Sequence, residues 1–204
     1  MKTAGNLFII TAPSGAGKTS LVRALLAADV RTRLSVSFTT RAMRPGETDG
    51  KDYHFVTEDR FMPMLERADF LESAEVHGAR YGTSQSAVAS ELAEGHDLIL
   101  EIDWQGAEQV RRLYPPAIGI FILPPSFEAL EQRLYKRGQD TPQVIARRVA
   151  GARQEVAHVS EFDYVIINEE FETALQDLLA IVRCHRLNTE KQLRRHQELL
   201  QKFI

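Results

Sequence analysis

Ala12-Pro13-Ser14-Gly15-Ala16-Gly17-Lys18-Thr19 is the stretch that decides how this chain folds. It follows the apolar run 7–10 and precedes a helical pattern whose apolar face starts at Leu21. A strand, a glycine-containing loop and Gly-Lys-Thr opening a helix are the context of a phosphate-binding loop, or P-loop. Its glycines let successive backbone N–H groups point at an anion, and the helix N-terminus adds unpaired donors. We therefore predict that 12–19 binds nucleotide phosphates, with Lys18 on the β- and γ-phosphates and Thr19 on Mg²⁺.

The loop departs from the usual pattern at its first position, where Ala12 stands in place of glycine. Alanine is acceptable there if its φ angle is negative, because only a positive φ favours glycine. The alternative for the stretch is an ordinary glycine-rich connection between a strand and a helix.

Composition limits the classes of protein to be considered. With 204 residues, 44% of them hydrophobic, the chain can bury a full core in one domain or one domain with insertions. The net charge of −3 provides no general basic field, so we expect no nucleic-acid partner. Cys184 is the only cysteine, which excludes an internal disulfide, and we expect its thiol to be buried and inert. No signal peptide or membrane span is evident, so we expect a cytoplasmic protein without a membrane partner.

The pattern along the chain predicts an α/β fold with a mainly parallel sheet flanked by helices. Apolar runs predict core strands at 7–10, 97–103, 118–123 and 164–168, and shorter strands at 34–40, 53–56, 70–76 and 80–83, the last two joined at His77-Gly78. Helices are expected at 61–68, with Pro63 in the first turn, at 84–94, closed by Gly95, and after 168, with an apolar face at Leu175, Leu178, Leu179 and Val182.

Two polar segments interrupt this core, and we treat 1–204 as a single domain. The core is predicted to comprise 1–34, 87–125 and 157–204, with a small mixed α/β insertion at 35–86, whose strands are expected to be antiparallel, and an arginine-rich helical segment at 126–156. Arg133, Arg137 and Arg148 in the second segment are suited to stabilising a phosphoryl group during transfer. Arg41 and Arg44 in the first are suited to a second phosphate. Ordinary surface charge is the alternative for both groups.

Four separated blocks, in order and at matching spacing, give the chain a resemblance to the guanylate kinase family over residues 6–182. They are the P-loop 12–19, the segment 35–41 with Arg44-Pro45-Gly46-Glu47, the block Tyr81-Gly82-Thr83, and Ile102-Asp103-Trp104-Gln105-Gly106. The resemblance implies an ATP:GMP phosphotransferase that uses Mg²⁺, accepts GMP and dGMP, and has a GMP-binding insertion at 35–86 and a lid at 126–156. A homo-oligomer is compatible with the sequence.

The resemblance also implies roles for individual residues. The GMP phosphate would be bound by Ser37, Arg41, Arg44, Tyr53 and Tyr81, and guanine would be recognised by Glu72, Thr83 and Asp103. The lid arginines Arg137 and Arg148, with Arg133 beside them, would close over ATP, and Asn168 would contact the adenine side. Glu101 stands where the family has aspartate, and we expect it near Mg²⁺, through water. Glu47 is expected at the GMP site, orienting Arg44 or Lys51.

The chemistry of guanine supports this assignment. Guanine presents N1–H and its 2-amino group side by side, a carboxylate accepts both, and adenine lacks that donor pair, so AMP would leave buried acceptors unpaired. The attacking phosphate oxygen of GMP is already ionised near neutral pH, since its second pKa is about 6. We therefore expect no general base, and no catalytic role for His54, His77, His96, His158, His185 or His196.

Three alternatives remain. The first is a related small-molecule kinase with another phosphorylated acceptor, such as a ribose bisphosphate. The second is a catalytically inactive guanylate-kinase-like module that binds phosphopeptides, against which the intact Gly17-Lys18-Thr19 argues. The third, a regulatory GTPase, lacks its Asn-Lys-x-Asp base-reading motif in this sequence.

Overall fold

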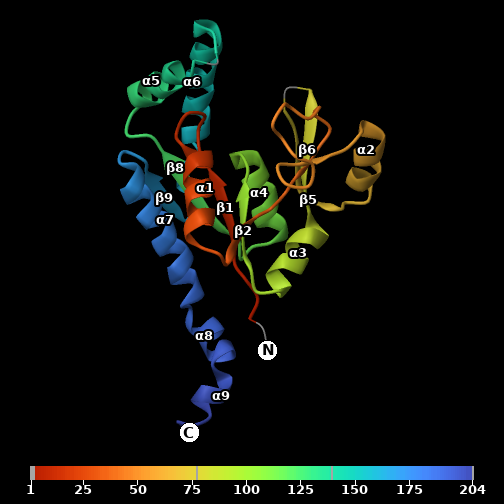
Figure 1. Ribbon diagram of the computed structural model, residues 1–204, viewed down its shortest axis with the longest axis vertical. Helices are drawn as coiled ribbons and strands as arrows, with labels where there is room; N and C mark the ends of the chain where they lie inside the picture. Colours follow the sequence, from red (N-terminus) through yellow and green to blue (C-terminus); the bar gives the residue numbers. More distant parts are fainter. Residues whose placement is uncertain (1–2, 77, 139, 204) are drawn as a thin grey trace.

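The computed structural model describes residues 3–76, 78–138 and 140–203. The strand and helix on either side of the P-loop form as predicted, as β1 (Leu7–Thr11) and α1 (Lys18–Ala28). β1 is buried along its whole length and lies in the middle of a five-stranded sheet (Figure 1). The P-loop therefore starts at the centre of the molecule.

All strand pairs in this central sheet are parallel, and the strand order is β2-β7-β1-β8-β9. β1 pairs with β7 (Asp97–Glu101) and β8 (Ile118–Leu123), and the outer strands are β2 (Thr32–Leu34) and β9 (Tyr164–Ile167). Parallel strands bring their carboxyl ends to the same edge, where ligands bind in open α/β sheets. The P-loop and the acidic end of β7 share this edge.

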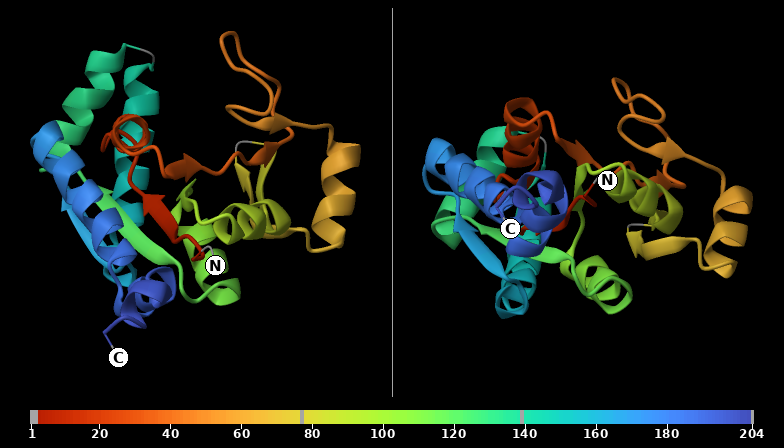
Figure 2. Two further views of the ribbon diagram at one scale, coloured as in Figure 1. Left: turned by 60° about the horizontal axis from the view of Figure 1, so that its bottom comes forward. Right: turned by 90° about the horizontal axis from the view of Figure 1, so that it is seen from below.

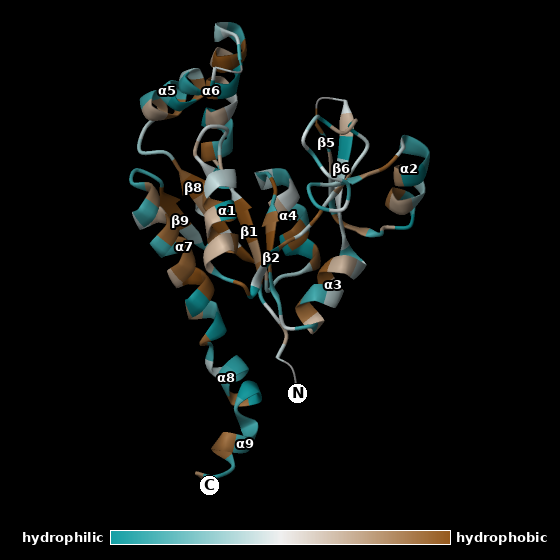
Figure 3. Cartoon of the chain, viewed as in Figure 1, coloured by the Kyte–Doolittle hydropathy of each residue, from teal (hydrophilic) through white to brown (hydrophobic). Residues whose placement is uncertain are grey.

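Helices cover both faces of the central sheet, and Figure 3 shows the apolar strands enclosed between them. Phe8 and Ile10 pack on the side of α1 and α7 (Phe171–Arg186), whereas Leu7 and Ile9 pack on the side of α3 (Gln85–Ala93) and α4 (Trp104–Leu113). Successive strand residues point to opposite faces, so a strand buried on both sides reads as a continuous apolar run. The predicted fold class, α/β with a mainly parallel sheet, is confirmed.

The first polar segment forms a second sheet, with strand order β4-β3-β6-β5. It contains β3 (Phe38–Thr39), β4 (His54–Phe55), β5 (Phe70–Val76) and β6 (Ala79–Ser84), with α2 (Glu58–Glu66) beside it (Figure 2). β5 and β6 pair antiparallel, but β3 and β4 are parallel, so the prediction of an antiparallel insertion is wrong for that pair. His77, in the predicted link between β5 and β6, lies outside the described residues.

The prediction of one strand over 34–40 is wrong. Leu34 ends β2 in the central sheet, and Phe38 begins β3 in the second sheet. Between them, the Ser35 N–H donates to the Ile99 carbonyl at 2.9 Å, and the Ser37 carbonyl accepts from His54 N–H at 2.9 Å. The alternating pattern runs through 34–40 without a break because its first part belongs to a strand of the central sheet and its second part to a strand of the second sheet.

Two smaller predictions are also wrong. Pro63 lies in the second turn of α2, because that helix begins at Glu58, earlier than predicted. Cys184 is exposed, because the buried stripe of α7 runs through Leu178 and Val182, and a residue two positions beyond Val182 points away from it. The predicted end of the helix at Gly95 is confirmed by its positive φ of 86° after α3.

The second polar segment forms two helices, α5 (Phe127–Arg137) and α6 (Pro142–Val156), which stand above the P-loop (Figure 1). They have a small apolar core of their own, formed by Leu130, Leu134, Ile145 and Ala152. The 3₁₀ turn η1 (Val159–Glu161) leads back to β9, and after α7 the short helices α8 (Thr189–Arg195) and α9 (Gln197–Leu200) extend away from the sheet. Across the three described ranges, every helix is too short or too polar to cross a membrane.

Candidate active site

The P-loop has the backbone geometry that anion binding requires. Gly15 and Gly17 have φ angles of +96° and +98°, values that side chains rarely allow. Ala68 is the only non-glycine residue with positive φ in the described part of the chain, so Ala12 has an ordinary φ. The alanine at the first loop position is thus compatible with the loop, as the sequence analysis required.

Two side chains from distant elements hold the P-loop from outside. The buried Asn168 amide donates to the Ala16 carbonyl at 2.6 Å, and Arg133 donates to the Asn168 carbonyl at 2.8 Å. Both residues also line an open cavity of about 320 Å³ beside the loop, together with Gly15, Gly17, Ser20, Lys136, Arg137, Glu169 and Phe171. The sequence predicts that Asn168 and Arg133 contact ATP. In the structure Asn168 donates to the loop backbone, and Arg133 donates to the Asn168 carbonyl and, at 3.5 Å, to the Ala16 carbonyl of the loop.

Three carboxylates surround Lys18 in a larger cavity of about 650 Å³. Lys18 is half-buried, and its Nζ donates to the Ile102 carbonyl at 3.4 Å, between the acidic residues Glu101 and Asp103. Glu155 of α6 lines the same cavity. Burial lowers the pKa of Lys18, and the three carboxylates oppose that shift. Burial likewise raises the pKa of Glu155.

Glu155 was not singled out from the sequence. A signal was available, since Glu155 follows Arg148 by seven residues in one helix, which puts both on the same face. Arg148 lies 3.2 Å from Asp140 and 3.5 Å from the Ser14 hydroxyl of the P-loop. One face of α6 therefore supplies both a cation and a carboxylate to the phosphate end of the site.

Thr19 and Glu101 offer a pair of oxygen ligands at the start of α1. The Thr19 hydroxyl donates to Glu101 Oε1, so a hydroxyl and a carboxylate oxygen already lie together at the carboxyl end of β7. Mg²⁺ prefers such hard oxygen ligands and keeps several waters. The residues present therefore fit a magnesium ion brought in with a nucleotide.

Across the cavity, Arg41 is held by Glu47. Its Nη2 lies 2.7 Å from Glu47 Oε1, while Glu47 Oε2 accepts the backbone N–H of Arg44 at 2.7 Å. The hydrogen bond between them raises the pKa of Arg41 and lowers that of Glu47. The expected contact of Glu47 with Arg44 is made to the backbone of that residue, and the side chain that Glu47 orients is Arg41, because the turn 41–47 folds back on itself. Arg41 also lies over the rings of Tyr53 and Phe55, at 5.5 and 5.7 Å.

The predicted base-recognising residues form a connected chain. Glu72 and Thr83 are register partners on β5 and β6, and the buried Thr83 hydroxyl donates to Glu72 Oε1 at 2.6 Å. The Ser37 hydroxyl lies 3.1 Å from that of Thr83. Burial raises the pKa of Glu72, and Asp103 adds to the shift, whereas the hydrogen bond from Thr83 opposes it. Asp103 caps α4 by accepting the Gly106 N–H at 2.8 Å.

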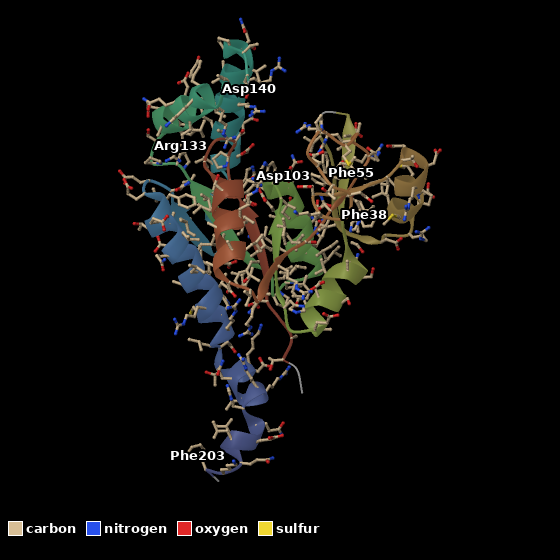
Figure 4. All side chains as sticks on the ribbon, viewed as in Figure 1. Phe38, Phe55, Asp103, Arg133, Asp140 and Phe203 are labelled. Atoms are coloured by element: carbon tan, nitrogen blue, oxygen red, sulfur yellow. The ribbon has the colours of Figure 1, made fainter. Side chains whose placement is uncertain are left out.

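The large cavity brings together much of the predicted site. Its lining includes the P-loop residues 12–15 and 17–19, and Glu101 and Asp103 at the end of β7. Ser37, Glu47 and Tyr53 line it from the segment 35–86, and Arg137 and Glu155 line it from α5 and α6. Figure 4 shows Asp103 between Arg133 and Asp140, of the segment 126–156, on one side and Phe38 and Phe55 on the other. Arg41, Arg44, Glu72, Tyr81, Thr83 and Arg148 are not part of its lining. None of the histidines that the structure describes lines it either.

Comparisons with known proteins agree on one family. The family model for guanylate kinase matches residues 4–185. Curated guanylate kinases from Methylobacillus flagellatus and Thiobacillus denitrificans are 69% and 59% identical to this chain, which aligns over 98% of its length with 99% and 95% of theirs. The crystal structure of guanylate kinase from Anaplasma phagocytophilum superposes with a TM-score of 0.75 at 33% identity, covering 92% of this chain and 89% of that one. The family model and both curated relatives cover nearly the whole chain, which also has the P-loop and the parallel sheet, so the chain belongs to the guanylate kinase family.

Proposed function

We propose that this chain transfers the γ-phosphoryl group of ATP to GMP, and to dGMP, giving ADP and GDP or dGDP. Guanylate kinase activity is the activity of the family to which it belongs. The single observation that carries the assignment of residues is the cavity of about 650 Å³, which is lined on one side by the P-loop and on the other by Ser37, Glu47 and Tyr53. A donor phosphate and an acceptor phosphate could meet there without crossing bulk water.

In this proposal the P-loop and the lid hold the donor. The backbone N–H groups of 12–19 and Lys18 bind the β- and γ-phosphates, and Arg137 and Arg148 neutralise the charge that accumulates during transfer. Asn168 and Arg133 support this from outside the P-loop, and the cavity they line beside it would take the nucleoside part of ATP. Thr19 and Glu101 would hold Mg²⁺, which supplies further positive charge to the phosphates.

The insertion holds the acceptor. Arg41 is already oriented by Glu47, so it presents its guanidinium to the GMP phosphate, together with Ser37, Arg44, Tyr53 and Tyr81. Glu72, Thr83 and Asp103 would bind the guanine edge. Because Glu72 is 5% exposed, an analogue that leaves its carboxylate unpaired is strongly disfavoured.

No side chain has to remove a proton from the acceptor, because the GMP phosphate is ionised near neutral pH. The protein contributes alignment of two anions and compensation of their charge. The predicted division into a core, a GMP-binding insertion at 35–86 and a lid at 126–156 gives each ligand its own cover. Closure of both covers would exclude water and prevent hydrolysis of ATP.

The deciding experiment measures ADP production from ATP and Mg²⁺ with GMP, dGMP, AMP, UMP and CMP offered separately. Turnover confined to GMP and dGMP, and abolished by EDTA, would support the proposal. Binding of GMP or a phosphopeptide without turnover would favour the non-catalytic module instead. A cytoplasmic location and a homo-oligomer stay predictions, to be checked by cell fractionation and by light scattering of the purified chain.

A further inference from the structure

Trp104 and His158 form a flat aromatic stack between the acceptor side of the site and the lid. Their ring centroids are 3.5 Å apart and their planes differ by 9°. Trp104 is the only tryptophan in the sequence, and neither residue lines the large cavity. The stack therefore contains none of the proposed ligand-binding residues, but it connects the helix next to the guanine site with the end of the arginine-bearing helix α6.

Trp104 is fixed to the guanine-recognising side. It is the first residue of α4, directly after the N-cap Asp103. Gly106, which donates to Asp103, is packed so closely against Glu72 that a Cβ on it would lie 3.2 Å from Glu72 Oε2. Further along α4, Gln109 exchanges two hydrogen bonds of 3.1 Å with the backbone of Ser73 in β5. A shift of the base-recognising strand is thus transmitted to the start of α4.

His158 is fixed to the lid. It follows α6 directly, and its backbone N–H donates to the Glu155 carbonyl at 3.1 Å. Its Nδ1 lies 2.7 Å from Glu161 Oε1, which sets the orientation of the ring. Arg148 lies on α6, eight residues before that helix ends at Val156 and about 12 Å from its end along the axis. A small change of angle at His158 therefore moves the guanidinium at the P-loop.

We infer that the Trp104–His158 stack is a positioning contact that couples GMP binding to the placement of the lid arginines over ATP. The inference rests on the proposed function. GMP binding favours one position of α4, and ATP binding favours one position of α6. The stack forms best when both helices are in these positions, so either ligand stabilises the position that the other requires. Such coupling is reciprocal: GMP raises the affinity for ATP by the same factor as ATP raises the affinity for GMP.

The size of the effect follows from the contact. Aromatic pairs are worth about 0.5–1.5 kcal/mol beyond buried area, which corresponds to a factor of roughly 2 to 12 in an equilibrium. We therefore expect the wild-type chain to bind GMP about two- to twelvefold more tightly when the β,γ-imido analogue of ATP is present with Mg²⁺. His158→Ala should bring this factor to near 1 while the affinity for each ligand alone changes by less than about twofold.

Calorimetric titration of GMP, with and without the saturating analogue, measures the factor by which the analogue raises the affinity for GMP. His158→Phe keeps a flat ring on Trp104 and should restore it. His185→Ala is the matched control, because His185 also packs against an aromatic ring, that of Tyr164, but lies on α7 away from the lid. The fluorescence of Trp104 should change when either ligand binds alone, and this response to the ATP analogue should be lost in His158→Ala.

The outcomes separate the inference from the function on which it rests. A wild-type chain that does not bind GMP refutes the proposed function, and the inference with it. A wild-type chain that binds both ligands independently refutes the inference alone. So does a His158→Ala variant that loses stability but keeps the wild-type factor, because the stack would then be purely structural. If His158→Ala does not fold, Trp104→Leu against Trp104→Phe gives the same comparison by calorimetry.

Discussion

Replacing Glu72 by glutamine should stabilise the protein and weaken its binding of GMP. Glu72 is 5% exposed, and burial raises the pKa of its carboxyl, so ionisation of this group costs the folded chain free energy that glutamine does not lose. Glutamine has the same shape, and its amide oxygen can still accept the hydrogen bond from Thr83. We expect the free energy of unfolding to rise by about 0.5–2 kcal/mol, the usual size of a single stabilising change.

The effect on GMP has the opposite sign. A carboxylate accepts two N–H groups of guanine, whereas glutamine turns a donor toward one of them. Loss of a hydrogen bond to a charged group costs about 1.5–3 kcal/mol, which weakens binding roughly 10- to 150-fold. Calorimetry with GMP and urea unfolding of the free protein measure the two effects separately.

The pH dependence tests the cause of the gain in stability. A carboxyl whose pKa is raised on folding favours the folded state most at low pH, and that contribution is lost as the pH rises through the raised pKa. The advantage of Glu72→Gln should therefore be largest at neutral pH and disappear as the pH falls and Glu72 becomes protonated. An advantage that does not depend on pH would contradict the electrostatic explanation.

Glu75→Gln is the matched control, because Glu75 is exposed on the same strand. It should change the free energy of unfolding and the binding free energy of GMP by less than about 0.5 kcal/mol. The reasoning is refuted if Glu72→Gln binds GMP as tightly as the wild type. It is also refuted if the variant is less stable at neutral pH than the wild type.

Three further predictions test other parts of the molecule. Lys18→Met should lower turnover by about 10²–10³-fold or more and leave GMP affinity unchanged in calorimetry, because Lys18 lies at the donor end; lost GMP binding with preserved turnover would contradict its role. Gly17→Ala should weaken ATP binding and lower the free energy of unfolding by about 1 kcal/mol or more, because φ of Gly17 is +98° and a Cβ would lie 2.3 Å from Asn168 Nδ2. Gly46→Ala, at φ +89° with nothing within 4 Å, measures the cost of the positive φ alone, and equal losses of stability in both variants would refute the steric argument. Arg186→Ala should cost about 3–5 kcal/mol in urea unfolding, since it leaves the buried Asp97 carboxylate and the half-buried Asp29 carboxylate without their arginine, while the kinetic constants stay the same. A loss below about 1 kcal/mol would show that the ion pairs contribute little.

The local chemistry of the chain was sufficient to predict the P-loop, the parallel sheet and the two interruptions. Gly15, Gly17 and Lys18 define a strand–loop–helix unit within a dozen residues, and continuous apolar runs identify strands buried on both faces. The same local information could not divide 34–40 between two sheets, because β2 and β3 share one alternating pattern. The exposure of Cys184, in contrast, follows from the predicted apolar face of that helix, because a residue two positions beyond Val182 points away from it.

The assembled site depends on contacts between residues far apart in the sequence. The register of β5 and β6 makes Thr83 and Glu72 hydrogen-bond partners, and the fold of the turn 41–47 pairs Glu47 with Arg41. The packing of α6 brings Glu155 into the cavity that Lys18 lines. Sequence alone determined which residue types were available for phosphate and guanine, since those are set by short motifs. Only the tertiary structure decided which of them meet in one cavity, because burial, hydrogen-bond partners and shifted pKa values arise when separate elements pack together.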